Sequence, residues 1–164
     1  MRFTTIDLLT IAGKEAIAIT TNGTVKPDGS ANMGRGNALA VAARFPAIAA
    51  KLGHLIQTSG NHVHDLGSNI FSFPVEETWL SQAELRLVKR SAQELLALVE
   101  ARGIDRITLP LPGCGKGGLD RTEVIAVLEQ IFDDRFLVTQ QPDNLPGSIS
   151  VKDSPAGLKK QSGC

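Results

Sequence analysis

The chain has 164 residues, of which 42% are apolar and 21% charged, and its 17 basic side chains balance 17 acidic ones. This length allows one domain with a substantial core and is too short for two. The formal net charge of zero excludes a broad nucleic-acid or membrane-surface binder, although a local basic patch remains open.

The first half of the chain predicts two strands and a helix. Residues 2–9 carry β-branched side chains typical of a strand, and residues 15–21 form a nearly continuous apolar run that suits a strand buried on both faces. A polar loop containing glycine and proline follows over residues 22–32. Apolar residues then recur at helical spacing over residues 36–52, where Pro46 must kink or end the helix.

The second half predicts further alternation of strands and helices. Helices are expected over residues 81–102 and 121–132, and strands over residues 62–65, 68–75, 106–111 and 135–139. Ser81 is the expected N-cap of the first helix, with Glu84 as its capping-box partner. The order β-β-α-β-α-β-α-β predicts an α/β fold with a largely parallel sheet, in a domain over residues 1–139. Residues 140–164 are rich in Pro, Gly, Ser and Lys and predict an irregular tail.

Two glycine-rich turns are the most informative motifs. Residues 32–36 (NMGRG) and 113–118 (GCGKGG) each follow a strand pattern and precede a helical one. Such turns leave backbone N–H groups free to approach an anion, and a helix N-terminus adds partial positive charge. Two turns in one small domain predict a ligand with adjacent phosphates, held from both sides. Neither turn is a dinucleotide fingerprint or a Walker A loop, because a third glycine is missing from the first and Lys116 precedes Gly117 in the second.

Three side chains near these turns have both a ligand-binding and a structural interpretation. Asp7 can accept a hydrogen bond from an adenine amine, or it is a solvated acid at a strand end. Asn22 follows the second strand, and its amide suits either a ribose hydroxyl or a turn. Cys114 is a candidate nucleophile for which the sequence supplies no base, so packing beneath its loop is the stronger interpretation.

Two carboxylates are candidates for acid–base chemistry. Glu76, which precedes Glu77 and Trp79, either borders a pocket or belongs to a solvated loop. Asp120 either caps the next helix, which is the stronger interpretation, or acts as a catalytic acid. Although a strand would place His62 and His64 on one face, no third ligand is evident and we expect no metal site.

Several segments together resemble the macrodomain family of ADP-ribose-binding modules, in particular the branch of DNA-antitoxin-type and terminal ADP-ribose glycohydrolases. The resemblance covers residues 4–138, and its most specific segments are Thr21–Gly23, Asn32–Ala38, Phe73–Pro74 and Leu109–Asp120. It implies a single three-layer α/β/α domain with a mixed, largely parallel sheet. It also implies that ADP-ribose is bound with adenine at Asp7 and Leu8, by the residues Asp7, Leu8, Thr21, Asn22, Met33, Gly34, Arg35, Gly36, Pro112, Gly113, Cys114, Gly115, Lys116, Gly117, Gly118 and Leu119.

The sequence departs from the catalytic members of this family. Val75 and Glu76 follow the Phe-Pro pair where a lysine is common, and Lys116 stands in the second turn where one subgroup has an aspartate. The chain is therefore expected to bind ADP-ribose or an ADP-ribosylated macromolecule, and whether it also hydrolyses the linkage stays open. If it does, the candidate catalytic residues are Asn22, Glu76 and Asp120. The alternatives are a non-catalytic reader or sequestering module and, third, a mononucleotide binder that uses Lys116.

Cysteine content and apolar patterning bear on compartment and partners. The two cysteines, Cys114 and Cys164, are too few for a disulfide framework, which fits a reducing cytoplasm. No apolar leader follows Met1, and no apolar run approaches the ~18–20 residues that span a bilayer. We therefore expect a cytoplasmic monomer with no membrane partner, no cofactor and no extended nucleic-acid footprint.

Overall fold

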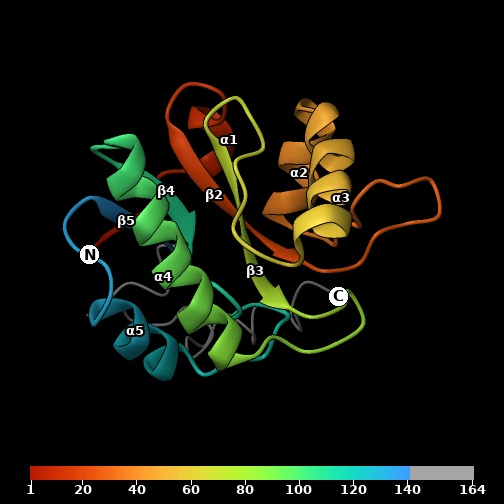
Figure 1. Ribbon diagram of the computed structural model, residues 1–164. Helices are drawn as coiled ribbons and strands as arrows, with labels where there is room; N and C mark the ends of the chain where they lie inside the picture. The colour runs from red at the N-terminus through yellow and green to blue at the C-terminus, as the bar shows by residue number, and fades with distance from the viewer. Residues whose placement is uncertain (141–164) are drawn as a thin grey trace, which may run out of the picture.

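The computed structural model describes residues 1–140 and consists of one sheet with helices on both faces (Figure 1). The strands are ordered β1-β5-β4-β2-β3, and every ladder between them is parallel. In chain order the elements are β1 (Arg2–Thr4), α1 (Leu8–Ile11), β2 (Ala16–Asn22), α2 (Asn37–Arg44), α3 (Ala47–Ser59), β3 (Ile70–Glu76), α4 (Leu85–Arg102), β4 (Ile107–Pro110), α5 (Arg121–Glu129) and β5 (Phe136–Thr139). The predicted α/β class and largely parallel sheet are confirmed, and within the described residues antiparallel pairing is limited to the isolated bridges Val25–Ala31 and Asp65–Phe71.

Two hydrophobic clusters, one on each face of the sheet, make the fold a three-layer sandwich. Figure 1 shows α4 and α5 on one side of the sheet and α2 and α3 on the other. Successive residues of β2 alternate between the faces, so Ile17 and Ile19 pack with the α1–α3 cluster and Ala18 packs with the α4–α5 cluster. Burial of β2 on both faces explains why its sequence is an almost unbroken apolar run.

Only the first part of the strand predicted at residues 2–9 is a strand in the structure, and its second part belongs to a helix. β1 ends at Thr4, and residues 8–11 form the short helix α1 instead of continuing to residue 9. Asp7 causes the change, because its carboxylate accepts a hydrogen bond from the Leu9 N–H at 2.9 Å and so acts as an N-cap. Leu8 then turns into the core, where it is 1% exposed.

Two further predictions about local structure were wrong. α4 begins at Leu85 with Glu84 at its N-cap position, whereas Ser81 belongs to a separate turn in which its hydroxyl donates to the Thr78 carbonyl at 2.8 Å. Residues 62–65 form no strand, and their backbone is instead bonded to side chains such as that of Ser72. These residues lie beside the edge strand β3, where the Ser72 N–H donates to the His64 carbonyl at 2.9 Å and Asp65 forms an isolated antiparallel bridge with Phe71, but the pairing does not extend into a ladder.

Other local predictions are confirmed. Pro46 separates α2 from α3, as its missing N–H requires. Asp120 caps α5, since its carboxylate accepts a hydrogen bond from the Glu123 N–H at 3.0 Å. Residues 141–164, with Cys164 and nearly all of the predicted tail, lie outside the described residues.

Within residues 1–140, no single helix combines the length and apolar character needed to cross a membrane. α2 and α3 reach the length and apolar character of a membrane span only when they are counted together, and the two helices meet at a bend of 116°.

The parallel sheet places the carboxyl ends of β2, β3 and β4 along one edge. β2 lies between β3 and β4, so the loops that leave these three strands are neighbours. The first glycine-rich turn lies between β2 and α2, and the second lies between β4 and α5. Both turns therefore emerge at the edge where ligands bind in open parallel sheets.

Gly53 holds the long loop that leaves β2 against α3. A Cβ at this helical position would lie 2.0 Å from the carbonyl oxygen of Gly29 and 2.8 Å from the amide nitrogen of Ala31. The Ala31 amide in turn donates to the Ala49 carbonyl of α3 at 2.8 Å. Loop and helix thus meet backbone to backbone, and the loop cannot retreat without losing this bond.

We predict that Gly53→Ala lowers the free energy of unfolding by about 2 kcal/mol, because the overpacking exceeds the gain in helix propensity. Thermal unfolding followed by circular dichroism measures the change. Gly115→Ala is the matched control, since a Cβ there meets no atom within 4 Å. Equal melting temperatures for the two variants would contradict the packing described.

Candidate functional site

A cavity of about 490 Å³ lies at the carboxyl ends of β2, β3 and β4. Such a volume is typical of a small-molecule site. Of the residues singled out from the sequence, it is lined by Thr21, Asn22, Met33, Gly34, Arg35, Gly36, Glu76, Trp79, Gly113, Gly115, Lys116 and Gly117. Two segments that are about 80 residues apart in the chain, the two glycine-rich turns, therefore share one cavity.

Asn22 anchors the first turn to the end of β2. Its side chain is 5% exposed, and its amide nitrogen donates to the Asn32 carbonyl at 3.0 Å while its amide oxygen accepts from the Thr24 N–H at 2.9 Å. The Asn32 side chain continues the clamp by accepting from the Gly34 N–H at 2.8 Å. The Asn22 and Asn32 side chains thus hold the first turn through two successive hydrogen bonds.

The first turn opens directly into the N-terminus of α2. Gly34 and Gly36 have φ values of +64° and +71°, which favour glycine, and Gly36 occupies the N-cap position without a capping side chain among the described residues. The first intrahelical bond runs from the Ala40 N–H to the Gly36 carbonyl. The N–H groups of residues 37–39 therefore lack partners within the part of the chain that the structure describes, and Asn37 faces the cavity.

The second turn is closed on itself and leaves its tip open. The Leu119 N–H donates to the Gly113 carbonyl at 2.9 Å, and Gly113 has a φ of +77°. A Cβ on Gly117 would lie 2.7 Å both from the Ala83 Cβ and from the Gly113 carbonyl oxygen, so only glycine fits this close approach. Among residues 1–140, no acceptor is bonded to the N–H groups of residues 115–117 at the tip.

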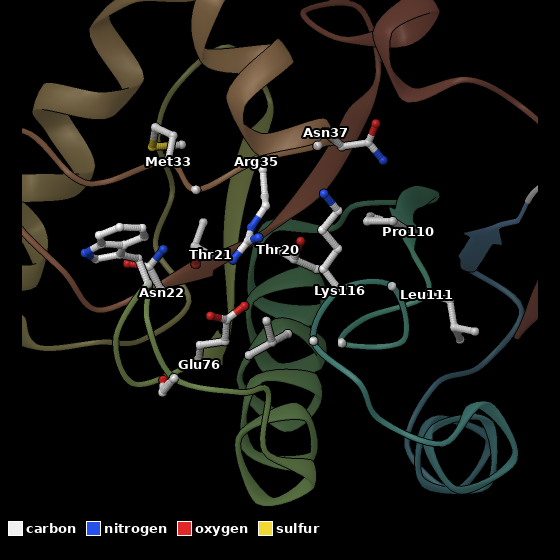
Figure 2. A pocket seen from close by; sticks show the side chains of 18 residues that line it. Thr20, Thr21, Asn22, Met33, Arg35, Asn37, Glu76, Pro110, Leu111 and Lys116 are labelled. Atoms are coloured by element: carbon white, nitrogen blue, oxygen red, sulfur yellow. The ribbon is translucent and has the colours of Figure 1, made fainter.

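Three charged side chains line the cavity. Figure 2 shows Arg35, from the first turn, reaching toward Glu76, with Lys116 approaching from the second turn. Burial at the end of β3 raises the pKa of the Glu76 carboxyl, and the positive charge of Arg35 opposes that rise. Two cations and one partly desolvated acid therefore face the same space.

Thr21, which precedes Asn22 in β2 (Figure 2), and Trp79 also line the cavity. The Thr21 hydroxyl oxygen is buried and has no hydrogen-bond partner within the described residues, which is costly unless a ligand or water provides one. Trp79 is 43% exposed, and its backbone N–H donates to the Thr24 hydroxyl at 3.1 Å. Its ring is thus an apolar surface on an anchored loop.

The remaining predicted site residues do not line the cavity. Asp7 and Asp120 cap α1 and α5 with their carboxylates, and Leu8 is buried in the core. The other four belong to the second turn, outside its open tip: Pro112, Cys114, Gly118 and Leu119. Nothing in the geometry tests a ligand role for these residues.

Cys114 packs against the α4–α5 cluster, and its thiol donates to the Pro112 carbonyl at 3.6 Å. Burial raises the pKa of this thiol to about 11 despite the nearby charge of Arg121. At neutral pH the group is a thiol and not a nucleophilic thiolate. This agrees with the packing interpretation of Cys114.

Six lining residues were not named as site residues from the sequence, although three of them lie in the segments that carry the family resemblance: Thr20, Asn37, Val75, Ser81, Pro110 and Leu111. Four of these, Thr20, Val75, Pro110 and Leu111, lie at or just past the carboxyl end of a strand that borders the cavity. That position was a usable signal. The sequence held no signal that identifies Ser81 as a site residue, because Ser81 reaches the cavity through the turn that it forms with Thr78.

The described part of the chain contains no group of three His, Cys, Asp or Glu side chains arranged to hold a metal ion. His62 instead contacts Glu94 through Nδ1 at 2.8 Å, and its ring lies edge-on to that of His64 with centroids 6.4 Å apart.

No protein-family model matches the sequence, and no curated protein sequence is significantly similar to it. Solved structures do resemble it. The macrodomain of Thermus aquaticus DarG is 25% identical over 86% of this chain and 97% of its own, with a TM-score of 0.71. The macrodomain of Mycobacterium tuberculosis DarG is 24% identical over 84% of this chain and 95% of its own, with a TM-score of 0.68.

A third similar structure is Thermosipho africanus DarTG in complex with ADP-ribose. It is 15% identical over 88% of this chain and 43% of its own length, with a TM-score of 0.69. The resemblance that the sequence motifs indicate is thus confirmed by the structural neighbours, and the chain has the macrodomain fold.

Proposed function

We propose that the protein binds ADP-ribose, free or attached to a macromolecule, with its diphosphate held between the two glycine-rich turns. The observation that carries this proposal is the convergence of two sets of backbone N–H groups without partners in residues 1–140 on one cavity. A diphosphate has acceptor oxygens on both sides, so it satisfies donors that approach from opposite walls. The N-terminus of α2 adds a favourable dipole at the first turn.

Charge complementarity supports the same ligand. Arg35 and Lys116 bring two positive charges to the cavity from different turns. A diphosphate diester carries two negative charges, and hydrogen bonds from charged donors are stronger than neutral ones. A neutral ligand of similar size would leave the excess positive charge of these side chains over Glu76 unbalanced.

The two ends of the cavity differ in chemistry, as the two halves of ADP-ribose do. Thr20 and Thr21 offer hydroxyl groups at the end of β2, where the Thr21 hydroxyl, which has no partner within the described residues, suits a ribose. Pro110 and Leu111 offer apolar surface at the end of β4, which suits a purine. The ADP-ribose complex of the similar DarTG protein supports this choice of ligand.

Hydrolysis of the ADP-ribosyl linkage is a second candidate function, favoured by one observation. Glu76 is the carboxylate that lines the cavity, and its ionised form could accept a proton from a water that attacks the anomeric carbon. Asp120 has its carboxylate in a helix cap, and Asn22 has both polar side-chain atoms in hydrogen bonds to the backbone. We therefore propose that turnover, if present, depends on Glu76, with Asn22 acting through the first turn.

We predict that ADP-ribose binds in isothermal titration calorimetry and changes the fluorescence of Trp79, the single tryptophan of the chain. Arg35→Ala and Lys116→Ala should each weaken binding about tenfold, because each removes a charged donor to phosphate. Lys26→Ala is the control, since Lys26 is exposed and does not line the cavity.

Absence of binding by the wild-type chain would overturn the proposal. ATP with magnesium serves as a competing ligand. Tight ATP binding together with indifference to ADP-ribose would favour a mononucleotide binder that uses Lys116.

For hydrolysis, we predict that Glu76→Gln abolishes release of ADP-ribose from modified protein or DNA while the melting temperature is retained. Asp120→Asn should leave any release unchanged, because asparagine also caps helices and the side chain lies outside the cavity lining. Release can be followed by chromatography of free ADP-ribose. Release that survives Glu76→Gln would refute the catalytic role of Glu76, and no release from any substrate by the wild type would identify a reader.

A further inference from the structure

We propose that Glu76 takes up a proton when the diphosphate ligand binds, and that it holds the ligand as a neutral carboxylic acid. This inference rests on the proposed function and deepens it, because it names the protonation state of the site that the ligand selects. Glu76 lines the cavity together with Arg35 and Lys116, and the Arg35 side chain reaches toward it (Figure 2).

The charges of the lining residues do not match the ligand when Glu76 is ionised. Arg35 and Lys116 contribute two positive charges, and an ionised Glu76 leaves a net charge of one. A diphosphate diester carries two negative charges at neutral pH. When Glu76 is protonated, the net charge of these lining side chains is equal and opposite to that of the ligand.

Glu76 cannot retreat from the ligand. It is the last residue of β3, pairs in register with Asn22 of β2, and its carbonyl accepts a hydrogen bond from the Asn61 side chain at 3.0 Å. The preceding Val75 is 4% exposed and faces the core. The backbone of Glu76 is thus held at both sides, which keeps its carboxyl at the cavity, where a nearby anion favours the neutral acid.

Ligand binding removes the group that stabilises the carboxylate. In the free protein the charge of Arg35 opposes the burial that raises the pKa of Glu76. A phosphate in the cavity draws the Arg35 guanidinium to itself and adds negative charge of its own. Both changes favour the protonated form of Glu76.

Neighbouring charged groups outside the cavity are already paired. Arg86 bridges Glu77 at 2.9 Å and Glu84 at 2.7 Å. Glu94 contacts His62 at 2.8 Å and Arg90 at 3.9 Å. None of these groups lines the cavity, so among the described residues Arg35 is the cation that acts on Glu76 there, and a bound phosphate would engage it.

A neutral Glu76 has different chemistry from the carboxylate. Its O–H can donate a hydrogen bond to a ligand oxygen, which an ionised carboxylate cannot do. It cannot accept a proton from water. Ligand affinity and any base catalysis by Glu76 should therefore change in opposite directions with pH.

The test is calorimetric titration of the full chain with ADP-ribose at several pH values between 5.5 and 8, in pairs of buffers with different ionisation enthalpies. The phosphates of ADP-ribose are diesters without a second ionisation, so the ligand itself takes up no proton in this range. We expect net uptake that approaches one proton per ligand. Affinity should fall as pH rises, at a limiting slope of about tenfold per pH unit.

Two variants test whether Glu76 is the group that takes up the proton. Glu76→Gln imitates the neutral acid, so it should bind without proton uptake, with affinity independent of pH and at least equal to that of the wild type. Glu77→Gln is the matched control, because it removes the adjacent exposed acid outside the cavity and should leave uptake unchanged.

Folding of the Glu76→Gln variant is checked in the absence of ligand. Because the folded-state pKa of Glu76 is raised, its contribution to stability is present below the unfolded pKa and is lost as pH rises through the folded value. The variant should therefore melt at or above the wild-type temperature at pH 7 and show no such advantage at pH 4.

Two outcomes separate this inference from the proposed function. Binding of ADP-ribose without proton uptake, or affinity reduced more than tenfold in a folded Glu76→Gln variant, refutes the inference and leaves the proposed function intact. No binding by the wild type at any pH refutes both.

Discussion

The clamp formed by two asparagine side chains is the contact on which the site depends. Asn22 lies at the buried end of β2 and holds the Asn32 carbonyl, while the Asn32 side chain holds the Gly34 N–H. Backbone bonds from Ala31 to Ala49 and from Asn32 to Thr24 hold the start of the turn, and the clamp fixes its glycine end, from which α2 begins. Asn22 therefore contributes to the site mainly by positioning backbone, which differs from the direct ribose contact that the family resemblance implies.

The sheet order makes the second wall of the cavity. β4 pairs with β2, so the turn after β4 must emerge beside the turn after β2. Glycine at 117 allows that turn to lie against Ala83, at the entrance to α4. On the other side of β2, the end of β3 lies at the same edge of the sheet and brings Glu76 to the cavity near Arg35. Binding and proton chemistry thus arise from one feature, the shared edge of three parallel strands.

Much of the fold could be predicted from the sequence, because apolar periodicity and glycine content are local signals. The buried strand at 15–21, the break at Pro46 and the cap at Asp120 are of this kind. α1 could not be, because the capping bond of Asp7 outweighs a β-branched pattern that continues past it. The lining by Ser81 and the raised pKa of Glu76 also depend on packing between distant segments, which local patterns do not encode.

The central claim is that the backbone amides of both turns meet one diphosphate. Amide chemical shifts in a ¹⁵N-labelled sample titrated with ADP-ribose test it most directly. The account predicts that the signals of residues 35–37 and 115–117 move together, with the same dissociation constant. Movement of one group alone, or of neither, would contradict it.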